Sequence, residues 1–518
     1  MKTLKLIVIL FLTALLRLNA GAQSEGFYHE FPVKFNDSVS MYFQQNSYQI
    51  SDTTFLSTGN YGSISYSLAG MVISDSSGNV LDTKYLLDIE ESFGLEGLIR
   101  LDDNRFVLFG EFDLYSDNTG NFIDLAPAMV CFNQQGEVIW QKAYGGYAPG
   151  FPDITEPSYD YYDYFSYAII DTAAQRIYAM GLSQSFNPEH VEKPYVVCTD
   201  YDGDTIWTWA MPEMSGFGFG KITGATINHD GDLVLVGQLE DFNDIKYLTY
   251  THGLILKLTS NGEMQWYKLW GDYQTWVPIS CDILELNNGE YIVGGLYVEC
   301  DTCTTDVGLL MKTDSEGNIT GQTYITKGNN HVIRLFKFFK KDYGFAVLGD
   351  FIIPDNGEIA GDNFFVNKYS YNLDIISETN YGNADDTFVL RGISETFDGG
   401  YLFTGVGGGI GLDPIINILM KSDGDLNLPM SEGWQNPINI EKVSGINYFP
   451  NPAGDVFCIT SNTNHPIGSI IITNLYGRTI HSEYCNENSV QINTSQYSTG
   501  MYILNINGTA VGKLLVQH

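Results

Sequence analysis

The stretch that decides the fold is Asp230-Gly231-Asp232-Leu233-Val234-Leu235-Val236-Gly237, a turn followed by an aliphatic run that ends in glycine. The same phrase returns at residues 288–295 and 398–405, and weaker copies end at Gly59, Gly110, Gly181 and Gly349. Asp-Gly and Asn-Gly favour hairpin turns, and the β-branched and aromatic runs that follow them are typical of strands. The chain therefore repeats one β unit.

A second phrase follows each copy of the first: an apolar strand, a turn rich in Asp or Asn, and another strand. It is clearest around Thr259-Ser260-Asn261-Gly262, and the other turns centre on Gly78, Gly136, Gly203, Gly317, Asn372 and Gly424. Both series recur with one period of about 58 residues, which marks a genuine repeat. In the best-preserved unit we expect strands over residues 221–228, 233–240, 252–260 and 263–271.

Four antiparallel strands leave two apolar faces that a single unit cannot bury, and radial stacking of units buries both. The sequence thus predicts an all-β fold: a seven-bladed β-propeller of four-stranded antiparallel blades over residues 23–425. The last unit offers only a poor fourth strand at residues 426–429. Phe27, Phe31, Val33 and Phe35 can share one face of a strand, and we expect this segment to close the ring on the last blade.

The phrases resemble those of a family of secreted propeller-like repeat proteins in which DGGYxxxG and LDxxGxxxWxKxYGG alternate. Residues 132–146 are the closest copy of the second phrase. The resemblance implies the fold and leaves the function open, because this architecture hosts many activities.

Charge limits the partners of this chain. Its 62 acidic and 26 basic residues give a net charge of -36, and only 17% of its 518 residues are charged. Such a surface repels phosphate backbones and anionic lipid heads, so we expect no nucleic-acid partner. Sugars, cations and basic proteins stay compatible with it.

Residues 1–22 have the pattern of a signal peptide. Lys2 and Lys5 precede an apolar stretch over residues 6–16, and Ala20-Gly21-Ala22 forms a small-residue cleavage site. No later segment is apolar for long enough to span a bilayer, so we expect no transmembrane segment in the mature chain.

After an expected linker at residues 426–446, the pattern changes at residues 447–518 to short alternating strands with Gly-centred turns, which predict a small C-terminal β-sandwich. This segment resembles the type A sorting domain of type IX secretion. The resemblance implies handling by the type IX machinery, passage through the periplasm, and release or attachment at the outer surface. The matching positions are Pro450, Asn451, Pro452, Gly477, Gly500, Tyr502 and Lys513.

Seven cysteines are too few for a disulfide scaffold. Cys300 and Cys303 lack the second pair or histidines that a zinc site needs, so we expect a loop-stapling disulfide there. We expect a second disulfide between Cys458 and Cys485, within the C-terminal segment.

Motifs of common enzymes are missing from the sequence. It contains no His-Glu-x-x-His, no Gly-x-Ser-x-Gly and no phosphate loop. The isolated histidines, including His229 and His252, are expected to be structural or surface residues. Asp200, Asp202 and Asp204 suggest a calcium loop, but Met211 stands where its bidentate Glu would be. A plain hairpin turn is expected, with a weak Ca²⁺ site as the alternative; no other metal or cofactor is predicted.

One connection is unusually long, because the step from Gly110 to Gly181 exceeds the other steps. Aromatic rings beside carboxylates stack on sugars and accept their hydroxyl protons, and loops carry function more often than strands. A surface loop whose tyrosines pack on their own blade is the alternative. The candidate ligand-binding residues are Asp153, Glu156, Tyr159, Asp160, Tyr161, Tyr162, Asp163 and Tyr164.

The sequence favours a secreted or surface-attached binding protein for carbohydrate or protein ligands, without enzymatic activity. A glycan-degrading enzyme with carboxylates on one propeller face is the first alternative. A purely structural surface component is the second.

Overall fold

The computed structural model describes strands and the tight turns between them. Within the described residues, no helix is long and apolar enough to cross a membrane. The described residues are 27–31, 33–35, 39–61, 68–87, 93–115, 122–144, 161–184, 192–212, 217–241, 250–271, 280–286, 289–298, 306–327, 332–355, 358–381, 387–408, 416–428, 446–449, 453–461, 466–474, 479–497, 500–506 and 509–516.

The described part of the body forms sheets of four or five strands, which we number in chain order. Sheet 1 contains β2 (Val33–Phe35), β3 (Val39–Gln49), β4 (Thr54–Tyr61), β5 (Leu68–Asp75) and β6 (Val80–Tyr85). Sheet 2 contains β7 (Phe93–Arg100), β8 (Arg105–Tyr115), β9 (Phe122–Asn133), β10 (Val138–Ala143) and β11 (Tyr161–Tyr162). Sheet 3 contains β12 (Tyr164–Asp171), β13 (Arg176–Ser183), β14 (Lys193–Asp200) and β15 (Thr205–Ala210).

Sheets 4 to 7 continue the same order. Sheet 4 contains β16 (Phe217–Ile227), β17 (Leu233–Asp241), β18 (Tyr250–Leu258) and β19 (Met264–Trp270), and sheet 5 contains β20 (Ser280–Glu285), β21 (Tyr291–Val298), β22 (Asp306–Thr313) and β23 (Ile319–Ile325). Sheet 6 contains β24 (Val332–Lys341), β25 (Gly344–Asp355), β26 (Glu358–Tyr369) and β27 (Ile375–Tyr381). Sheet 7 contains β28 (Thr387–Glu395), β29 (Tyr401–Gly408) and β30 (Ile416–Ser422), together with β1 (Phe27–Phe31).

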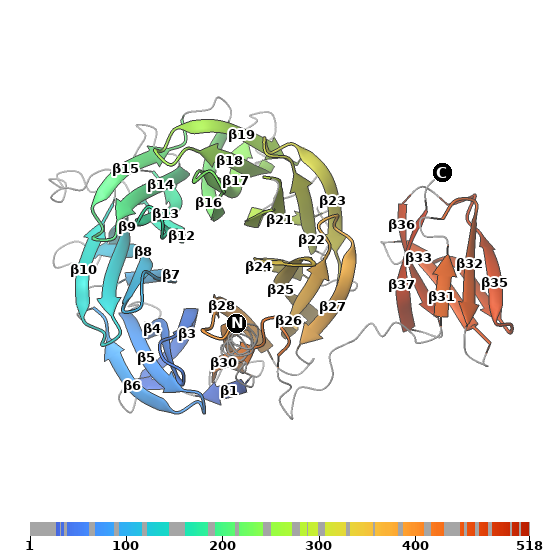
Figure 1. Ribbon diagram of the computed structural model, residues 1–518, viewed down its shortest axis with the longest axis horizontal. Helices are drawn as coiled ribbons and strands as arrows, with labels where there is room; N and C mark the ends of the chain where they lie inside the picture. The colour runs from blue at the N-terminus through green and yellow to red at the C-terminus, as the bar shows by residue number, and fades with distance from the viewer. Residues whose placement is uncertain are drawn as a thin grey trace, which may run out of the picture.

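These sheets stand like blades around a common centre, with β3, β7, β12, β16, β24 and β28 innermost and β6, β10, β15, β19, β23 and β27 at the rim (Figure 1). Neighbouring inner strands contact one another around this centre. The observed fold is therefore all-β and propeller-like, as the sequence predicted. In sheet 4 the four strands agree within a few residues with those expected from the repeat.

Both faces of each sheet are buried, which is why the units stack. In β17, Leu233 and Leu235 pack toward sheet 3, in a cluster with Tyr178 and Val196. The alternate residues Val234 and Val236 pack toward sheet 5, with Ile283 and Val293. Alternation along one strand thus supplies two separate cores.

The N-terminal strand joins the last sheet. β1 pairs antiparallel with β30, with Phe27 opposite Lys421 and Phe31 opposite Asn417. The expected pairing of this segment with the last unit is confirmed for residues 27–31. It is wrong for Val33 and Phe35: β2 pairs with β3 of sheet 1, because the chain passes from the last sheet to the first between β1 and β2.

The turns between third and fourth strands share one geometry. In each, a side-chain oxygen of the first residue accepts hydrogen bonds from the backbone N–H groups of the third and fifth, as Thr259 does from Asn261 and Glu263. The fourth residue is left-handed, with φ of +84° at Gly262. In sheets 6 and 7 this position is Leu373 (φ +68°) and Leu426 (φ +66°) rather than Asn372 or Gly424.

Where the second phrase has a tryptophan, the indole connects its unit to the next one. Trp140 Nε1 donates to the carbonyl oxygen of Tyr201 at 3.2 Å, and Trp207 Nε1 donates to that of Ser260 at 3.1 Å. A Cβ on Gly262 would lie 2.8 Å from the Trp207 ring, so the turn glycine leaves room for the indole. The spacing of Gly and Trp in the repeat therefore serves contacts between sheets.

Cys131 and Cys198 are buried free thiols on the third strands of sheets 2 and 3. Burial raises the pKa of each thiol to about 12, so both stay protonated and unreactive near neutral pH. We expect neither to react with iodoacetamide at pH 8 in the folded protein, while the partly exposed Cys485 is labelled and all react in denaturant. Mass spectrometry of labelled peptides measures this, and labelling of Cys131 as fast as Cys485 would contradict it.

The C-terminal segment forms two facing sheets. One contains β31 (Ile446–Phe449), β32 (Val456–Ser461) and β35 (Ser489–Asn493); the other contains β33 (Gly468–Asn474), β34 (Thr479–Cys485), β36 (Gly500–Ile506) and β37 (Thr509–Val516). Phe457 and Ile459 from the first sheet share one core with Ile470, Leu504 and Leu514 from the second. All members of this core lie between residues 448 and 516, so the segment has a core of its own.

The expected disulfide between Cys458 and Cys485 is wrong, since both thiols are free. Cys458 lies in the three-stranded sheet, in register with Gln491, whereas Cys485 ends β34 in the facing sheet. The Cys485 thiol donates instead to the carbonyl oxygen of Glu487 at 3.5 Å. Cys300 and Cys303 lie outside the described residues.

Candidate functional site

The order of strands makes the two ends of the ring different. Counting outward from the inner strands β3, β7, β12, β16, β20, β24 and β28, the turns that follow the first and the third strand of each sheet lie at one end, which we call the tight-turn face. The end of each second strand and the beginning of each inner strand lie at the opposite end, which we call the loop face. The first residues of every inner strand therefore point toward the loop face.

Each inner strand carries a β-bulge at the same place. There the register with the second strand shifts by one residue in six sheets and by two in β3, between Phe43 and Ser47; β16 has a further shift between Phe217 and Gly220. Bulges re-aim side chains and are common beside functional sites. The residues inserted at the six single shifts are Glu96, Ser166, Thr223, Cys281, Phe336 and Arg391.

The glycines that end the first phrase lie opposite these bulges. Gly237 pairs with Ile222, the residue before the bulge, and the other six glycines hold the equivalent register. A Cβ on Gly237 would lie 2.0 Å from the carbonyl oxygen of Lys221, and one on Gly181 would lie 2.1 Å from that of Tyr164. The recurring glycine thus makes room for inner-strand backbone just before the bulge.

A polar cluster made of Tyr167, Asp282 and Lys337 occupies the centre of the ring. Lys337 Nζ, on β24 of sheet 6, donates to Tyr167 Oη, on β12 of sheet 3, at 2.7 Å. Sheets 4 and 5 separate these strands, so the bond crosses the axis. Lys337 Nζ also contacts Asp282 Oδ1 at 3.2 Å, and Asp282 Oδ2 accepts a hydrogen bond from the Phe338 N–H at 2.8 Å. We call these three residues the axial cluster.

Burial controls the charges of the axial cluster. Burial raises the pKa of Asp282, and the nearby ammonium of Lys337 opposes this shift. Burial alone lowers the pKa of Lys337, but the charge of Asp282 and the contact with Tyr167 outweigh it and raise the pKa. Burial also raises the pKa of Tyr167. The cluster therefore holds a charged ammonium and a neutral phenol at neutral pH.

Charged side chains also gather nearer the loop face. Glu96 and Arg391 are exposed bulge residues, and Lys221 lies two residues before a bulge. The Glu96 side chain keeps exposed surface, but the surrounding protein desolvates its carboxyl and raises its pKa, and the charges of Lys221 and Arg391 oppose the rise. Burial likewise raises the pKa of Glu192 and Glu240, against the charge of Lys221. The positive charge of Lys221 thus acts on carboxyls from three sheets.

The candidate loop residues fall at the start of sheet 3. Asp153, Glu156, Tyr159 and Asp160 lie outside the described residues. Tyr161 and Tyr162 form β11, which pairs parallel with Asp124 and Leu125 of β9. Asp163 is buried, and its Oδ1 accepts a hydrogen bond from the Gln184 N–H at 2.5 Å. Tyr164 is half-buried, and burial raises its pKa to about 12.

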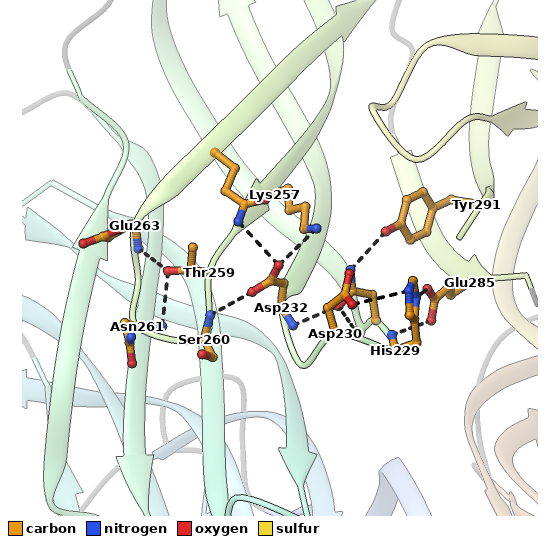
Figure 2. A network of polar contacts seen from close by, with 12 residues as sticks. His229, Asp230, Asp232, Lys257, Thr259, Ser260, Asn261, Glu263, Glu285 and Tyr291 are labelled. Atoms are coloured by element: carbon orange, nitrogen blue, oxygen red, sulfur yellow. Dashed lines mark hydrogen bonds and ion pairs between the residues drawn. The ribbon is translucent and has the colours of Figure 1, made fainter. Parts of the chain in front are cut away.

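The tight-turn face is held by internal contacts, as Figure 2 shows for sheets 4 and 5. Asp232 forms an ion pair with Lys257 at 3.0 Å, and its Oδ1 accepts a hydrogen bond from the Ser260 N–H. His229 Nδ1 lies 2.6 Å from Glu285 Oε1 of the next sheet, and this hydrogen bond raises the pKa of His229. The polar groups of these turns therefore connect strands and sheets.

The turn at Asp200 also uses its carboxylate internally. Asp200 Oδ1 accepts hydrogen bonds from the Asp202 and Asp204 N–H groups at 2.9 and 2.8 Å, and Asp204 Oδ1 lies 2.6 Å from Lys142 Nζ. This is the expected hairpin turn. Among the described residues, no group of three or more His, Cys, Asp or Glu side chains could hold a metal ion.

The C-terminal segment places some of its expected sorting residues. Tyr502 is buried in the core of the two sheets, and Gly500 and Lys513 lie on the paired strands β36 and β37. Pro450, Asn451, Pro452 and Gly477 lie outside the described residues. Residues 447–517 match the family model of the secretion system C-terminal sorting domain. The tail is a type IX sorting domain. It marks this protein as one exported by type IX secretion to the cell surface or the extracellular space.

Comparison with curated proteins finds no match. Solved structures that resemble the chain include a protein of unknown function from Dyadobacter fermentans DSM 18053, with 9% identity, a TM-score of 0.40, and coverage of 78% of this chain and 99% of that one. An ulvan lyase bound to a GlcA(1-4)Rha3S saccharide has 7% identity, a TM-score of 0.45, and coverage of 72% and 90%. An α-L-arabinofuranosidase from Fusarium graminearum has 10% identity, a TM-score of 0.35, and coverage of 78% and 99%.

Neither the axial cluster nor the bulge residues were predicted from the sequence. A signal for the bulges was present, since each inserted residue precedes its repeat glycine by about 14 positions, as in Glu96 and Gly110. No comparable signal marks Lys337 and Tyr167 as partners.

Proposed function

We propose that residues 23–425 form a complete seven-bladed propeller, each sheet being one blade, and that β1 closes the ring. The sheets of the described residues and the pairing of β1 with β30 support this count. The proposed boundaries are a signal peptide at 1–22, a linker at 426–446 and the sorting domain at 447–518.

We propose that this propeller is a secreted or surface-held binding module for carbohydrate or protein, and that the loop face receives the ligand. One observation carries the choice of face: the strand ends at Ala143 and Tyr161, which border the longest interval between sheets, and the charged residues Glu96, Lys221 and Arg391 lie toward that face. The turns of the tight-turn face instead use their polar groups on each other. Glycan arrays and pull-downs with the mature body test this function. Failure to bind anything across broad panels of both would reject it and favour a structural role.

A glycan-degrading enzyme is the second candidate, because the pKa of Glu96, Glu192 and Glu240 is raised near the loop face. A carboxyl that keeps its proton can act as a general acid on a glycosidic oxygen. Screening the mature body for reducing ends released from polysaccharides separates this function from binding. Activity that is lost in Glu96→Gln but not in Glu263→Gln, an exposed carboxylate on the tight-turn face, would establish the enzyme.

Deleting residues 447–518 should leave the body folded but retained in the periplasm. The reason is that the sorting domain has its own core, and the body does not need that core to bury its sheets. Cell fractionation measures the location, and circular dichroism of the purified truncated chain measures the fold. Efficient release of the truncated protein to the medium would contradict this prediction.

A further inference from the structure

Lys337 presents a positive charge to the axis of a strongly acidic protein. Its side chain is 35% exposed, whereas that of its partner Asp282 is 2% exposed, so solvent reaches the cation of the pair and not the anion. With 62 acidic and 26 basic residues in the chain, an anion approaching the molecule meets few such groups. Arg334 on the same strand has a similar exposure beside the buried Asp350, but Lys337 is the cation that also bonds across the axis to Tyr167.

Among the described residues, the contacts of Lys337 leave one of its donors for a ligand. An ammonium carries three N–H donors, and the contacts with Tyr167 and Asp282 use two of them. The pKa of Lys337 is raised, so the group stays charged throughout the neutral range. A partly desolvated ammonium forms its strongest hydrogen bonds with carboxylate, sulfate or phosphate oxygens.

The axial cluster lies within reach of the loop face. Asp282 is the third residue of β20, and Tyr167 is the fourth of β12, counted from that end. The bond between Lys337 and Tyr167 joins opposite sides of the ring. Glu96 and Arg391 stand in the bulges that directly precede the equivalent positions on their own strands, and Lys221 lies nearer the loop face, so a ligand on the axis would meet these charged residues beside the cluster.

The residues beside the cluster favour a saccharide over an acidic protein surface. Glu96 is exposed and can accept hydrogen bonds from sugar hydroxyls. An acidic protein surface would instead be repelled by the net charge of the chain, which is -36. A neutral, hydroxyl-rich saccharide with one acidic group matches both the acceptor Glu96 and the cation Lys337.

We propose that the axial end of the loop face binds a saccharide that carries a carboxylate or sulfate group, with Lys337 Nζ holding that group. This inference rests on the proposed function, because it takes the loop face as the ligand face. It specifies the ligand class and the residue that selects it.

Isothermal titration of the mature body with dextran oligomers that carry one uronate carboxylate, one sulfate ester or neither group (neutral dextran) tests the proposal. The carboxylate and sulfate probes distinguish the two acidic groups, and neutral dextran measures binding that needs neither. We expect at least one acidic probe to bind, and neutral dextran to bind far more weakly.

The decisive variant is Lys337→Met combined with Asp282→Asn, since Lys337→Met alone would leave a buried carboxylate without its partner. Losing a charged hydrogen bond should weaken binding of the acidic probe about ten- to hundredfold. The matched control is Lys142→Met with Asp204→Asn, which removes an ion pair of 2.6 Å on the tight-turn face. Binding should be unchanged in the control, and thermal melts establish that both variants are folded.

Each negative result would contradict a different claim, either this inference alone or the proposed function as well. Equal binding of acidic probe by the Lys337→Met/Asp282→Asn variant would overturn the inference. Binding of neutral glycans or of proteins only would also overturn it, while the proposed binding function would stand. Absence of any ligand across the arrays, pull-downs and acidic probes would reject the proposed function along with it.

Discussion

A mature chain that begins at Pro32 should unfold at a lower temperature, less cooperatively, and with a tendency to aggregate. It lacks β1, whose five residues pair with β30 at the outer edge of the last sheet. Each lost backbone hydrogen bond costs roughly 0.5–1.5 kcal/mol net, so the expected loss in the free energy of unfolding is a few kcal/mol. The exposed edge of β30 then becomes a site for pairing with other chains.

This truncation separates ring closure from the role of β2. Starting the chain at Pro32 retains β2 on sheet 1, whereas starting it at Ser38 removes both strands. The control is removal of residues 23–26, which lie before β1 and should leave the melting curve unchanged. Calorimetry and light scattering measure the two effects. If the chain starting at Pro32 melts like the intact one, β1 does not close the ring.

Replacing Gly237 with alanine should destabilise the body by about 1–3 kcal/mol or more, in the range of overpacked sites. The new Cβ would lie 2.0 Å from the carbonyl oxygen of Lys221 and 3.0 Å from Ile222 Cα. Both atoms are backbone, so the clash is relieved only by moving the inner strand. Because this strand carries the bulge beside the loop face, ligand binding should weaken as well.

The matched control for Gly237→Ala is Gly321→Ala. Gly321 lies on the outer strand β23, and its added Cβ would meet only Leu373 Cδ1 at 3.7 Å, an ordinary contact. We expect its effect to stay within about 0.5 kcal/mol. Urea denaturation measures both variants. Equal stabilities of the two would show that the repeat glycine is not needed for space opposite the bulge.

The sequence by itself determined the parts of this protein that depend on local pattern. The turn phrases beginning at Asp230 and Thr259 located strands and hairpins, because left-handed turn positions and alternating apolar residues act over a few neighbouring residues. The last repeat also lacked a good fourth strand, and this gap predicted that residues 27–31 pair with the last sheet. Export was predicted from the C-terminal segment, because the strand and turn pattern of the sorting domain lies entirely within that segment.

Only the tertiary structure decided what the repeat brings together. Lys337 and Tyr167 are 170 residues apart, and their bond depends on which sheets face each other across the axis. The repeat period describes each unit alone and contains no such information. Gly237 likewise ends a strand phrase in sequence, but its role depends on the register with β16. Cys458 and Cys485 looked like a pair because they share one small domain, yet their strands belong to facing sheets. Contacts across a ring or between sheets are set by packing, which no local pattern records.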